Sequence, residues 1–204
     1  MLDVYVATLP TRPMDSTPLL PHKRQEQIDG VSNAALKKEK YFVWRLLERA
    51  LSQSLGINME NAELSLAESG KWTAASFYIS LSHRCKALAV AVSHAPVGVD
   101  IEPLSPGRGD SFARRIMTAN ELTLYESLPE DARAEFAVRC WTLKESIFKK
   151  QAGNFPFIPK ETESRTPASF SQRLELAGEE YCLSLASDAL MSGHTPKIIT
   201  VNDL

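Results

Sequence analysis

One short alternating stretch constrains this chain more than any other. Residues 97–102 read Val-Gly-Val-Asp-Ile-Glu, so apolar side chains alternate with glycine and carboxylates, as in a strand with one buried face. Asp100 and Glu102 then share the opposite face, about 6.5 to 7 Å apart. Two flexible carboxylates at that spacing can lean toward one ion between them, and Gly98 leaves room for another group to approach the backbone. The stretch predicts a half-buried strand that carries a candidate cation site.

A second feature is a long helix predicted over residues 129–151. Its apolar residues form one stripe, Ala132, Phe136, Cys140, Leu143 and Ile147. Further apolar positions extend that stripe over half or more of the circumference, so the helix must be largely buried. Glu145 and Lys149 lie one turn apart at the edge of the apolar surface. Such a pair is most often a surface ion pair worth a few tenths of a kcal/mol, but the half-buried setting favours a chemical role.

The remaining pattern predicts an α+β fold with two similar halves, residues 1–98 and 99–204. Each half combines a helix with a small, mainly antiparallel sheet. The expected elements are a helix over 32–56, a three-strand antiparallel meander over 77–102, a hairpin over 170–186 and a final strand over 197–201. Residues 153–167, rich in Pro, Ser and Thr, are expected to form a loop.

The amino-acid composition limits the classes of function that we expect of this protein. The 204 residues carry a net charge of −2, without the broad basic excess of a non-specific nucleic-acid binder. Three cysteines, far apart, fit neither a disulfide framework nor a zinc site and favour a reducing compartment. No signal peptide and no run of eighteen apolar residues is evident. We therefore expect a cytoplasmic protein that binds neither nucleic acid nor membrane.

Three motifs together resemble a known enzyme family. They are Ile79-Ser-Leu-Ser-His83, the stretch at 97–102, and Trp141-Thr-Leu-Lys-Glu-Ser146 followed by Lys149. Their order and spacing resemble the surfactin-synthetase-activating (Sfp) type of 4′-phosphopantetheinyl transferase, over roughly residues 20 to 185. The resemblance implies that fold and transfer of the phosphopantetheine arm of coenzyme A to a serine of an apo carrier protein, releasing adenosine 3′,5′-bisphosphate.

The resemblance also implies a metal and a set of catalytic residues. Mg²⁺ would be held by Asp100, Glu102 and Glu145, a choice that suits a hard ion preferring oxygen ligands. The acceptor of the serine proton is either Glu145 or a metal-bound water. Lys149 could stabilise or protonate the leaving phosphate. Glu121 falls where the family often has a glutamate, yet it also completes a Thr-x-x-Glu capping box that begins with Thr118, and both roles stay open.

Coenzyme A carries phosphates that need cationic or hydrogen-bonding partners. The residues matching the family's contacts are Lys23, Lys71, Ser82 and His83. Trp72 stands where the family motif has a proline, so the local backbone contact is in question. A histidine at a strand end is more often a satisfied surface group, and His83 gains weight only from the resemblance.

Two other readings remain open. A metal-dependent nuclease could use clustered carboxylates and a lysine, and a non-catalytic module could bind carrier proteins without transferring the arm. The expected partners of the main reading are coenzyme A and an apo acyl or peptidyl carrier protein. A monomer suffices, because the two halves can build one site within one chain.

Overall fold

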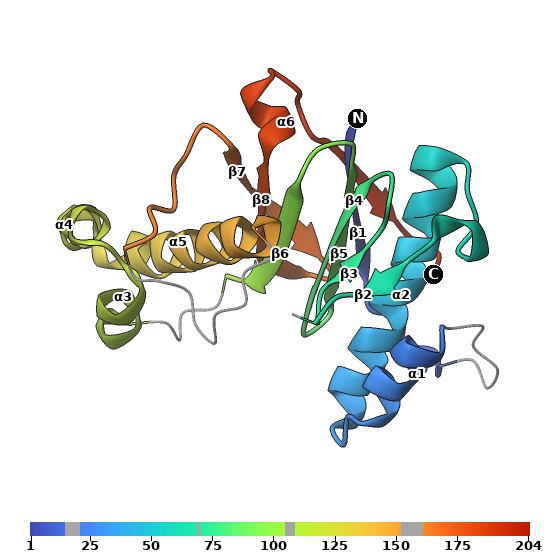
Figure 1. The fold of residues 1–204 in the computed structure, drawn as a ribbon. Coiled ribbons are helices and arrows are strands. Elements are labelled where there is room, and N and C mark those ends of the chain that lie inside the picture. The colour runs from blue at the N-terminus through green and yellow to red at the C-terminus, as the bar shows by residue number, and fades with distance from the viewer. Residues whose placement is uncertain (15–20, 69, 105–108, 152–160) are drawn as a thin grey trace.

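The computed structural model describes residues 1–14, 21–68, 70–104, 109–151 and 161–204, arranged as two helix-on-sheet units side by side (Figure 1). The strands are β1 Leu2–Thr8, β2 Ser65–Leu66, β3 Trp72–Thr73, β4 Tyr78–Arg84, β5 Ala87–Ser93, β6 Val97–Pro103, β7 Ser169–Leu176, β8 Glu179–Ser187 and β9 Lys197–Val201. The helices are α1 His22–Asp29, α2 Ala34–Leu55, the 3-10 turn η1 Glu60–Ala62, α3 Asp110–Ile116, α4 Ala119–Ser127, α5 Glu130–Lys150 and α6 Asp188–Met191.

The first unit packs α2 on a four-stranded sheet with the order β4-β5-β1-β9. The pairs β4/β5 and β5/β1 are antiparallel, and β9 pairs with β1 in parallel. Asn33 begins α2 by accepting a hydrogen bond from the Leu36 backbone N–H at 3.0 Å. Gly56 ends it with φ +66°, the left-handed conformation that glycine adopts without strain. The predicted helix and its stop at Gly56 are confirmed.

The second unit packs α5 on a three-stranded antiparallel sheet with the order β6-β8-β7. The predicted hairpin corresponds to β7 and β8. The two sheets face each other across a shared core. On β5 this core is contributed by three alanines, Ala87, Ala89 and Ala91, all with 0% exposure. These small side chains allow the second sheet to come close, so the order of layers is α2, sheet, sheet and α5.

The predicted three-strand meander is wrong in its last strand. β4 and β5 pair as expected, but β6 pairs with β8 in the other sheet. Its contact with β4 runs through side chains instead: Ser80 Oγ accepts from the Val99 backbone N–H at 3.0 Å, and Ser82 Oγ accepts from that of Ile101 at 3.3 Å. The two serine hydroxyls thus satisfy backbone donors where the two sheets meet.

Gly98 on β6 is required by the position of α5. A Cβ at this residue would lie 1.9 Å from the Ser146 carbonyl oxygen and 2.5 Å from the Lys150 backbone nitrogen. The group that approaches the backbone of residue 98 is therefore the helix itself. Because α5 lies directly on this face of β6, the carboxylates that alternate with the buried valines are brought against the helix.

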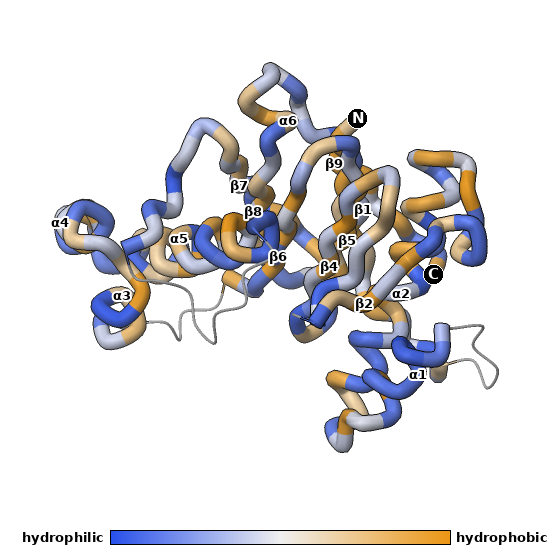
Figure 2. The backbone as a smooth tube through the Cα atoms, in the orientation of Figure 1, coloured by the Kyte–Doolittle hydropathy of each residue, from blue (hydrophilic) through white to orange (hydrophobic). Residues whose placement is uncertain are grey.

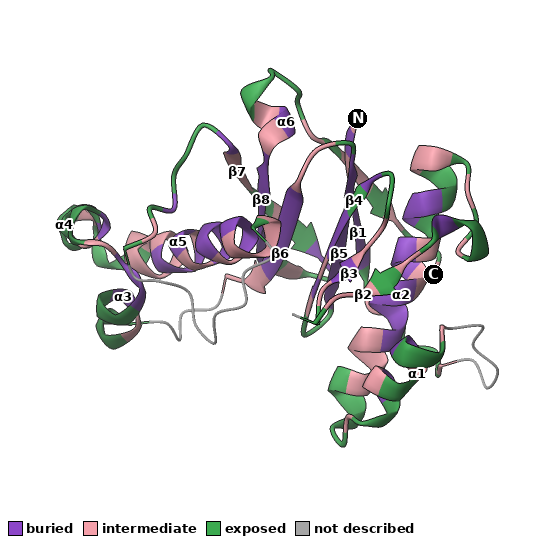
Figure 3. Cartoon of the chain, viewed as in Figure 1, coloured by how far each residue is buried: buried purple, intermediate pink, exposed green. Residues whose placement is uncertain are grey.

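The α+β class and the two similar units are confirmed. Buried residues follow β5, β6 and the middle turns of α2 and α5, whereas α1 is mostly hydrophilic and half of its residues are exposed (Figures 2 and 3). Residue 98 lies inside β6, and β9 from the C-terminal half completes the N-terminal sheet.

Residues 153–160 of the predicted loop lie outside the described residues. Within the described residues, no helix combines the length and apolarity needed to span a membrane.

Candidate functional site

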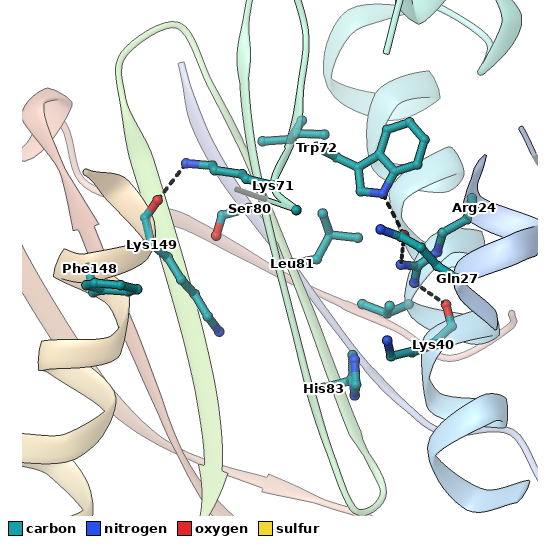
Figure 4. A pocket seen from close by; sticks show the side chains of 13 residues that line it. Arg24, Gln27, Lys40, Lys71, Trp72, Ser80, Leu81, His83, Phe148 and Lys149 are labelled. Carbon is teal, nitrogen blue, oxygen red and sulfur yellow. Dashed lines mark hydrogen bonds between the residues drawn. The ribbon is translucent and has the colours of Figure 1, made fainter. Parts of the chain in front are cut away.

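A pocket of about 340 Å³ lies where the two units meet, lined by α1, α2, β4, the β2–β3 connection and the last turn of α5. This volume is within the range of about 300 to 1,000 Å³ that is usual for small-molecule sites. Its titratable lining residues are all basic: Arg24, Lys40, Lys71, His83 and Lys149. Figure 4 shows Arg24, Lys40 and His83 across the hollow from Lys71 and Lys149. No acidic side chain belongs to the described lining.

Arg24 forms one wall of the pocket. Its guanidinium donates to Gln27 Oε1 at 3.3 Å and to the Lys40 carbonyl oxygen at 2.5 Å, and it lies over the Trp44 ring at 5.0 Å. Gln27 Oε1 also accepts from the Trp72 indole N–H at 3.1 Å (Figure 4). Arg24 is 7% exposed, and its Nε is buried without a hydrogen-bond partner in the described chain. Burial lowers the pKa of Arg24 to about 10.

Three other basic groups of the pocket also have lowered pKa values. Burial lowers the pKa of Lys71, and burial together with the charge of Arg24 lowers that of Lys40. Burial is also the main reason why the pKa of His83 lies below its usual value. Desolvation and mutual repulsion disfavour the charged forms of these groups. An anion in the pocket would relieve both effects.

Asp100 and Lys149 form the edge of this site toward β6. Lys149 Nζ lies 2.7 Å from Asp100 Oδ1 and also donates to Ser82 Oγ and the Val99 carbonyl oxygen, both at 3.2 Å. Ser82 Oγ donates to the same Asp100 oxygen at 2.8 Å. The two oxygens of Asp100 therefore differ, because Oδ2 is buried without a hydrogen-bond partner in the described residues.

Asp100 Oδ2 is the atom that indicates whether the site can hold a divalent cation. A buried carboxylate oxygen without a donor is costly, and a cation is one group that would satisfy it. Glu102 follows on the same strand and lies 3.5 Å from Arg84 Nε, while Glu145 is half-buried on α5. Among the described residues, no three Asp, Glu, His or Cys side chains are grouped to hold a metal. Mg²⁺ usually uses one or two carboxylates plus water and phosphate oxygens, so Asp100 and Glu102 suffice for the fit, and the three-ligand set stays a prediction.

Lys71 connects the two units. Its ammonium donates to the carbonyl oxygen of Lys149 at 2.6 Å (Figure 4). That carbonyl belongs to the last turn of α5, where helix carbonyls lack an intrahelical partner and a cation is favourable. Lys71 therefore holds the end of the helix that carries Lys149, and it lines the pocket at the same time.

Ser82 and His83 are neighbours on β4 but face different ways. Ser82 contacts Asp100 and Lys149 on the side of β6. His83 lines the pocket and its Nδ1 lies 2.9 Å from Glu39 Oε2 on α2. Of these two predicted coenzyme A contacts, the structure places His83 in the pocket and Ser82 beside Asp100 and Lys149. Their predicted roles stay predictions.

Glu121 lies in a separate, closed environment. The predicted capping box is confirmed: Thr118 and Glu121 exchange hydrogen bonds at the start of α4. Glu121 also accepts from the Ser164 backbone N–H at 2.7 Å and pairs with Lys144 Nζ at 2.7 Å. Burial alone would raise the pKa of Glu121, but the bonds from Lys144 and Ser164 outweigh it and leave that pKa below its usual value. A catalytic role for Glu121 remains a prediction.

Sequence reasoning missed two basic residues of the pocket, Arg24 and Lys40. Lys23 is exposed on α1 outside the described lining, whereas its neighbour Arg24 lies inside. Arg24 precedes the buried Ile28 by one turn, so a basic residue at an apolar helical position was the available signal. In α2, Lys40 likewise lies at a helical position between the apolar residues Leu36 and Val43.

Comparison with known proteins agrees with this geometry. A sequence model described as the 4′-phosphopantetheinyl transferase superfamily matches residues 96–193, the segment that carries Asp100 and α5. A 4′-phosphopantetheinyl transferase of Bacillus subtilis is 28% identical over 161 residues, 78% of this chain and 65% of the relative. A holo-[acyl-carrier-protein] synthase of Mycoplasma genitalium is 36% identical over 69 residues, 31% of this chain and 60% of the relative. The 4′-phosphopantetheinyl transferase gsp of Aneurinibacillus migulanus is 30% identical over 115 residues, 56% of this chain and 48% of the relative.

Residues 96–193, just under half of the chain, thus match the 4′-phosphopantetheinyl transferase superfamily, and relatives of that name align with a longer part of the chain. The Bacillus and Aneurinibacillus relatives agree with the Sfp type predicted from the three motifs. In each of these matches the chain spans less than two thirds of the relative's length.

Proposed function

We propose that this protein transfers the 4′-phosphopantetheine arm of coenzyme A to a serine of an apo acyl or peptidyl carrier protein. The observation that carries the proposal is the basic pocket beside Asp100. Three lysines, an arginine and a histidine line it, and burial or repulsion lowers the pKa of several of them. Such a site favours a ligand with several phosphate charges, and coenzyme A has a pyrophosphate and a 3′-phosphate.

In the proposed reaction, the serine hydroxyl attacks the pyrophosphate phosphorus attached to the pantetheine arm. A new bond forms between the serine oxygen and that phosphorus, and the bond to the bridging oxygen breaks. The leaving group is adenosine 3′,5′-bisphosphate, and the serine proton passes to a base. Mg²⁺, when bound, would neutralise the charge that develops on the phosphate oxygens.

The roles of metal binding, proton transfer and phosphate binding are assigned to different residues of this chain. Asp100 and Glu102 would hold the metal, with Glu145 as the proposed third ligand or as the base. Lys149 lies at the boundary between Asp100 and the pocket, so its ammonium can interact with the leaving phosphate without a large movement. Arg24, one of the basic lining residues, would compensate the other phosphates.

We also propose that the protein acts as a monomer in the cytoplasm. Both units contribute to the pocket within one chain. All three cysteines are free thiols, one exposed and two buried, which suits a reducing compartment.

Mass spectrometry tests the activity directly. With Mg²⁺ and coenzyme A, an apo carrier protein should gain the mass of one phosphopantetheine, and a chelator should prevent the gain. A panel of acyl and peptidyl carriers covers the substrate class. If the folded protein leaves the whole panel unmodified, the proposed activity is wrong; carrier binding without transfer would indicate a non-catalytic module.

A further inference from the structure

Glu39 on α2 contacts His83, the histidine that lines the pocket. Its Oε2 lies 2.9 Å from His83 Nδ1, and the two side chains are only 12% and 21% exposed. Glu39 does not itself belong to the described lining of the pocket. We infer that Glu39 is a positioning residue: it holds the His83 ring so that, on taking up a proton, the ring donates from Nε2 to a phosphate of bound coenzyme A. This inference rests on the proposed function.

The contact determines which ring nitrogen faces the ligand. A carboxylate can only accept a hydrogen bond, so Nδ1 carries the hydrogen in this contact. In the described chain no hydrogen bond to Nε2 is recorded, and His83 lines the pocket. Nε2 is therefore the nitrogen left for a ligand. Two fixed points, the strand and the carboxylate, hold the ring in one orientation.

The protonation state decides what Nε2 can do. In a neutral ring with its hydrogen on Nδ1, Nε2 is an acceptor and repels a phosphate oxygen; in the protonated ring both nitrogens donate. Burial, the largest effect, and the charges of Arg24 and Lys149 lower the pKa of His83, whereas Glu39 raises it, and the net direction is downward. The ring of the empty pocket is thus mostly neutral near neutral pH.

A bound phosphate changes this balance. It adds negative charge beside Nε2 and compensates the surrounding cations, so the pKa of His83 must rise on binding. Among the described residues, the charged groups that act on the pKa of His83 are Glu39 on α2, Arg24 on α1 and Lys149 on α5, and Lys40 and Lys71 also line the pocket. Glu39 is the one anion in that set. Without its charge the ring takes up a proton less readily, and a neutral ring with its hydrogen on Nδ1 presents a lone pair to the phosphate.

The inference predicts that coenzyme A binding takes up a proton at His83 and that Glu39 is needed for it. Isothermal titration with coenzyme A, in buffers of different ionisation enthalpy between pH 6.5 and 8.5, measures affinity and proton uptake together. Because a shift of one pKa unit corresponds to a tenfold change, we expect Glu39→Gln to weaken coenzyme A binding about tenfold at pH 7.5. It should also reduce the proton uptake.

Two further variants separate positioning from general electrostatics. Glu48→Gln removes the same charge from the same helix, at an exposed residue paired with Arg45, and should leave affinity and proton uptake unchanged. In a His83→Gln background, Glu39→Gln should change the affinity less than about twofold, since the two residues act as one unit. Thermal unfolding checks that each variant is folded.

The outcomes distinguish this inference from the proposed function. If the wild type binds coenzyme A but Glu39→Gln keeps its affinity and proton uptake, the inference is overturned and the proposed function stands. The same holds if Glu39→Gln weakens binding equally with and without His83. If the folded wild type binds no coenzyme A at all, the proposed function is overturned and this inference with it.

Discussion

Two of the lysine–carboxylate pairs formed by helix α5 have equal length and different character. Lys144 Nζ lies 2.7 Å from Glu121, and Lys149 Nζ lies 2.7 Å from Asp100. In the first pair the side chains are 1% and 6% exposed, and both oxygens of Glu121 accept hydrogen bonds. In the second pair the lysine is 28% exposed at the pocket, and one oxygen of Asp100 has no partner in the described chain.

The difference shows how a lysine paired with a carboxylate can serve either structure or chemistry. A closed pair whose polar atoms are all satisfied ties together the elements that contribute to it, here α4, α5 and the segment around Ser164. An open pair leaves capacity for a ligand. We therefore interpret the Glu121 pair as structural and the Asp100 pair as part of the reaction site.

The largest expected effect is at the open pair. Asp100→Asn keeps the shape and the acceptor oxygen but removes the charge that a metal requires. We expect phosphopantetheine transfer to fall at least about 1,000-fold, which is about 4 kcal/mol of transition-state stabilisation. The matched control is Asp188→Asn, which removes a carboxylate paired with Lys150 on the same helix and should alter transfer less than about twofold. Mass spectrometry measures the rate of transfer by each variant. If Asp100→Asn transfers the arm at a rate near that of the wild type, Asp100 does not belong to the metal site.

The next largest effect concerns stability at the closed pair. Glu121→Gln leaves Lys144 buried without its counter-charge, which costs about 3 kcal/mol of unfolding free energy. The double variant Glu121→Gln with Lys144→Met should recover part of that loss. Because the pKa of Glu121 is lowered by folding, its stabilisation is fully present above the ordinary glutamate pKa of about 4.3 and is lost as pH falls through the lower folded value. Urea unfolding from pH 7 down to pH 3 measures it, and an equal gap between variant and wild type at all pH values would contradict the ion pair.

The smallest effect is at the link between the units. Lys71→Met removes the donor to the Lys149 carbonyl, and losing one hydrogen bond from a charged donor costs about 1.5 kcal/mol or more. We expect transfer to slow about fivefold to tenfold, with Lys71→Arg, which keeps a cationic donor, closer to the wild type. Steady-state kinetics on a carrier substrate measures the change. Unaltered kcat and KM in Lys71→Met would show that α5 needs no such anchor.

Periodicity predicted the elements well because it reports which face of an element is buried. The long helix expected over 129–151 is α5, Glu130–Lys150, and the alternation at 97–102 is β6. Periodicity does not report which strands pair. β6 pairs with β8 of the second sheet and not with the preceding strand, as the meander predicted. Its contact with β4 is made through the hydroxyls of Ser80 and Ser82.

The site was predicted in part for a similar reason. Motif spacing identified Asp100 and Lys149, which the structure brings to 2.7 Å. Arg24 and Lys40 were missed because their role depends on the packing of α1 and α2 around the pocket, where a basic residue replaces an apolar one. A basic residue at an apolar helical position marks Arg24 as unusual, but it does not indicate which elements pack around that position.

One measurement tests the contrast between the two pairs most directly: the single-turnover rate of transfer per folded molecule for Asp100→Asn and Glu121→Gln side by side. Saturating coenzyme A, Mg²⁺ and carrier remove differences in binding, and the folded fraction corrects for stability. Our account predicts that Glu121→Gln keeps at least about a third of the wild-type rate while Asp100→Asn loses at least about 1,000-fold. A folded Glu121→Gln protein as slow as Asp100→Asn would contradict the account, because it would place Glu121 in the reaction itself.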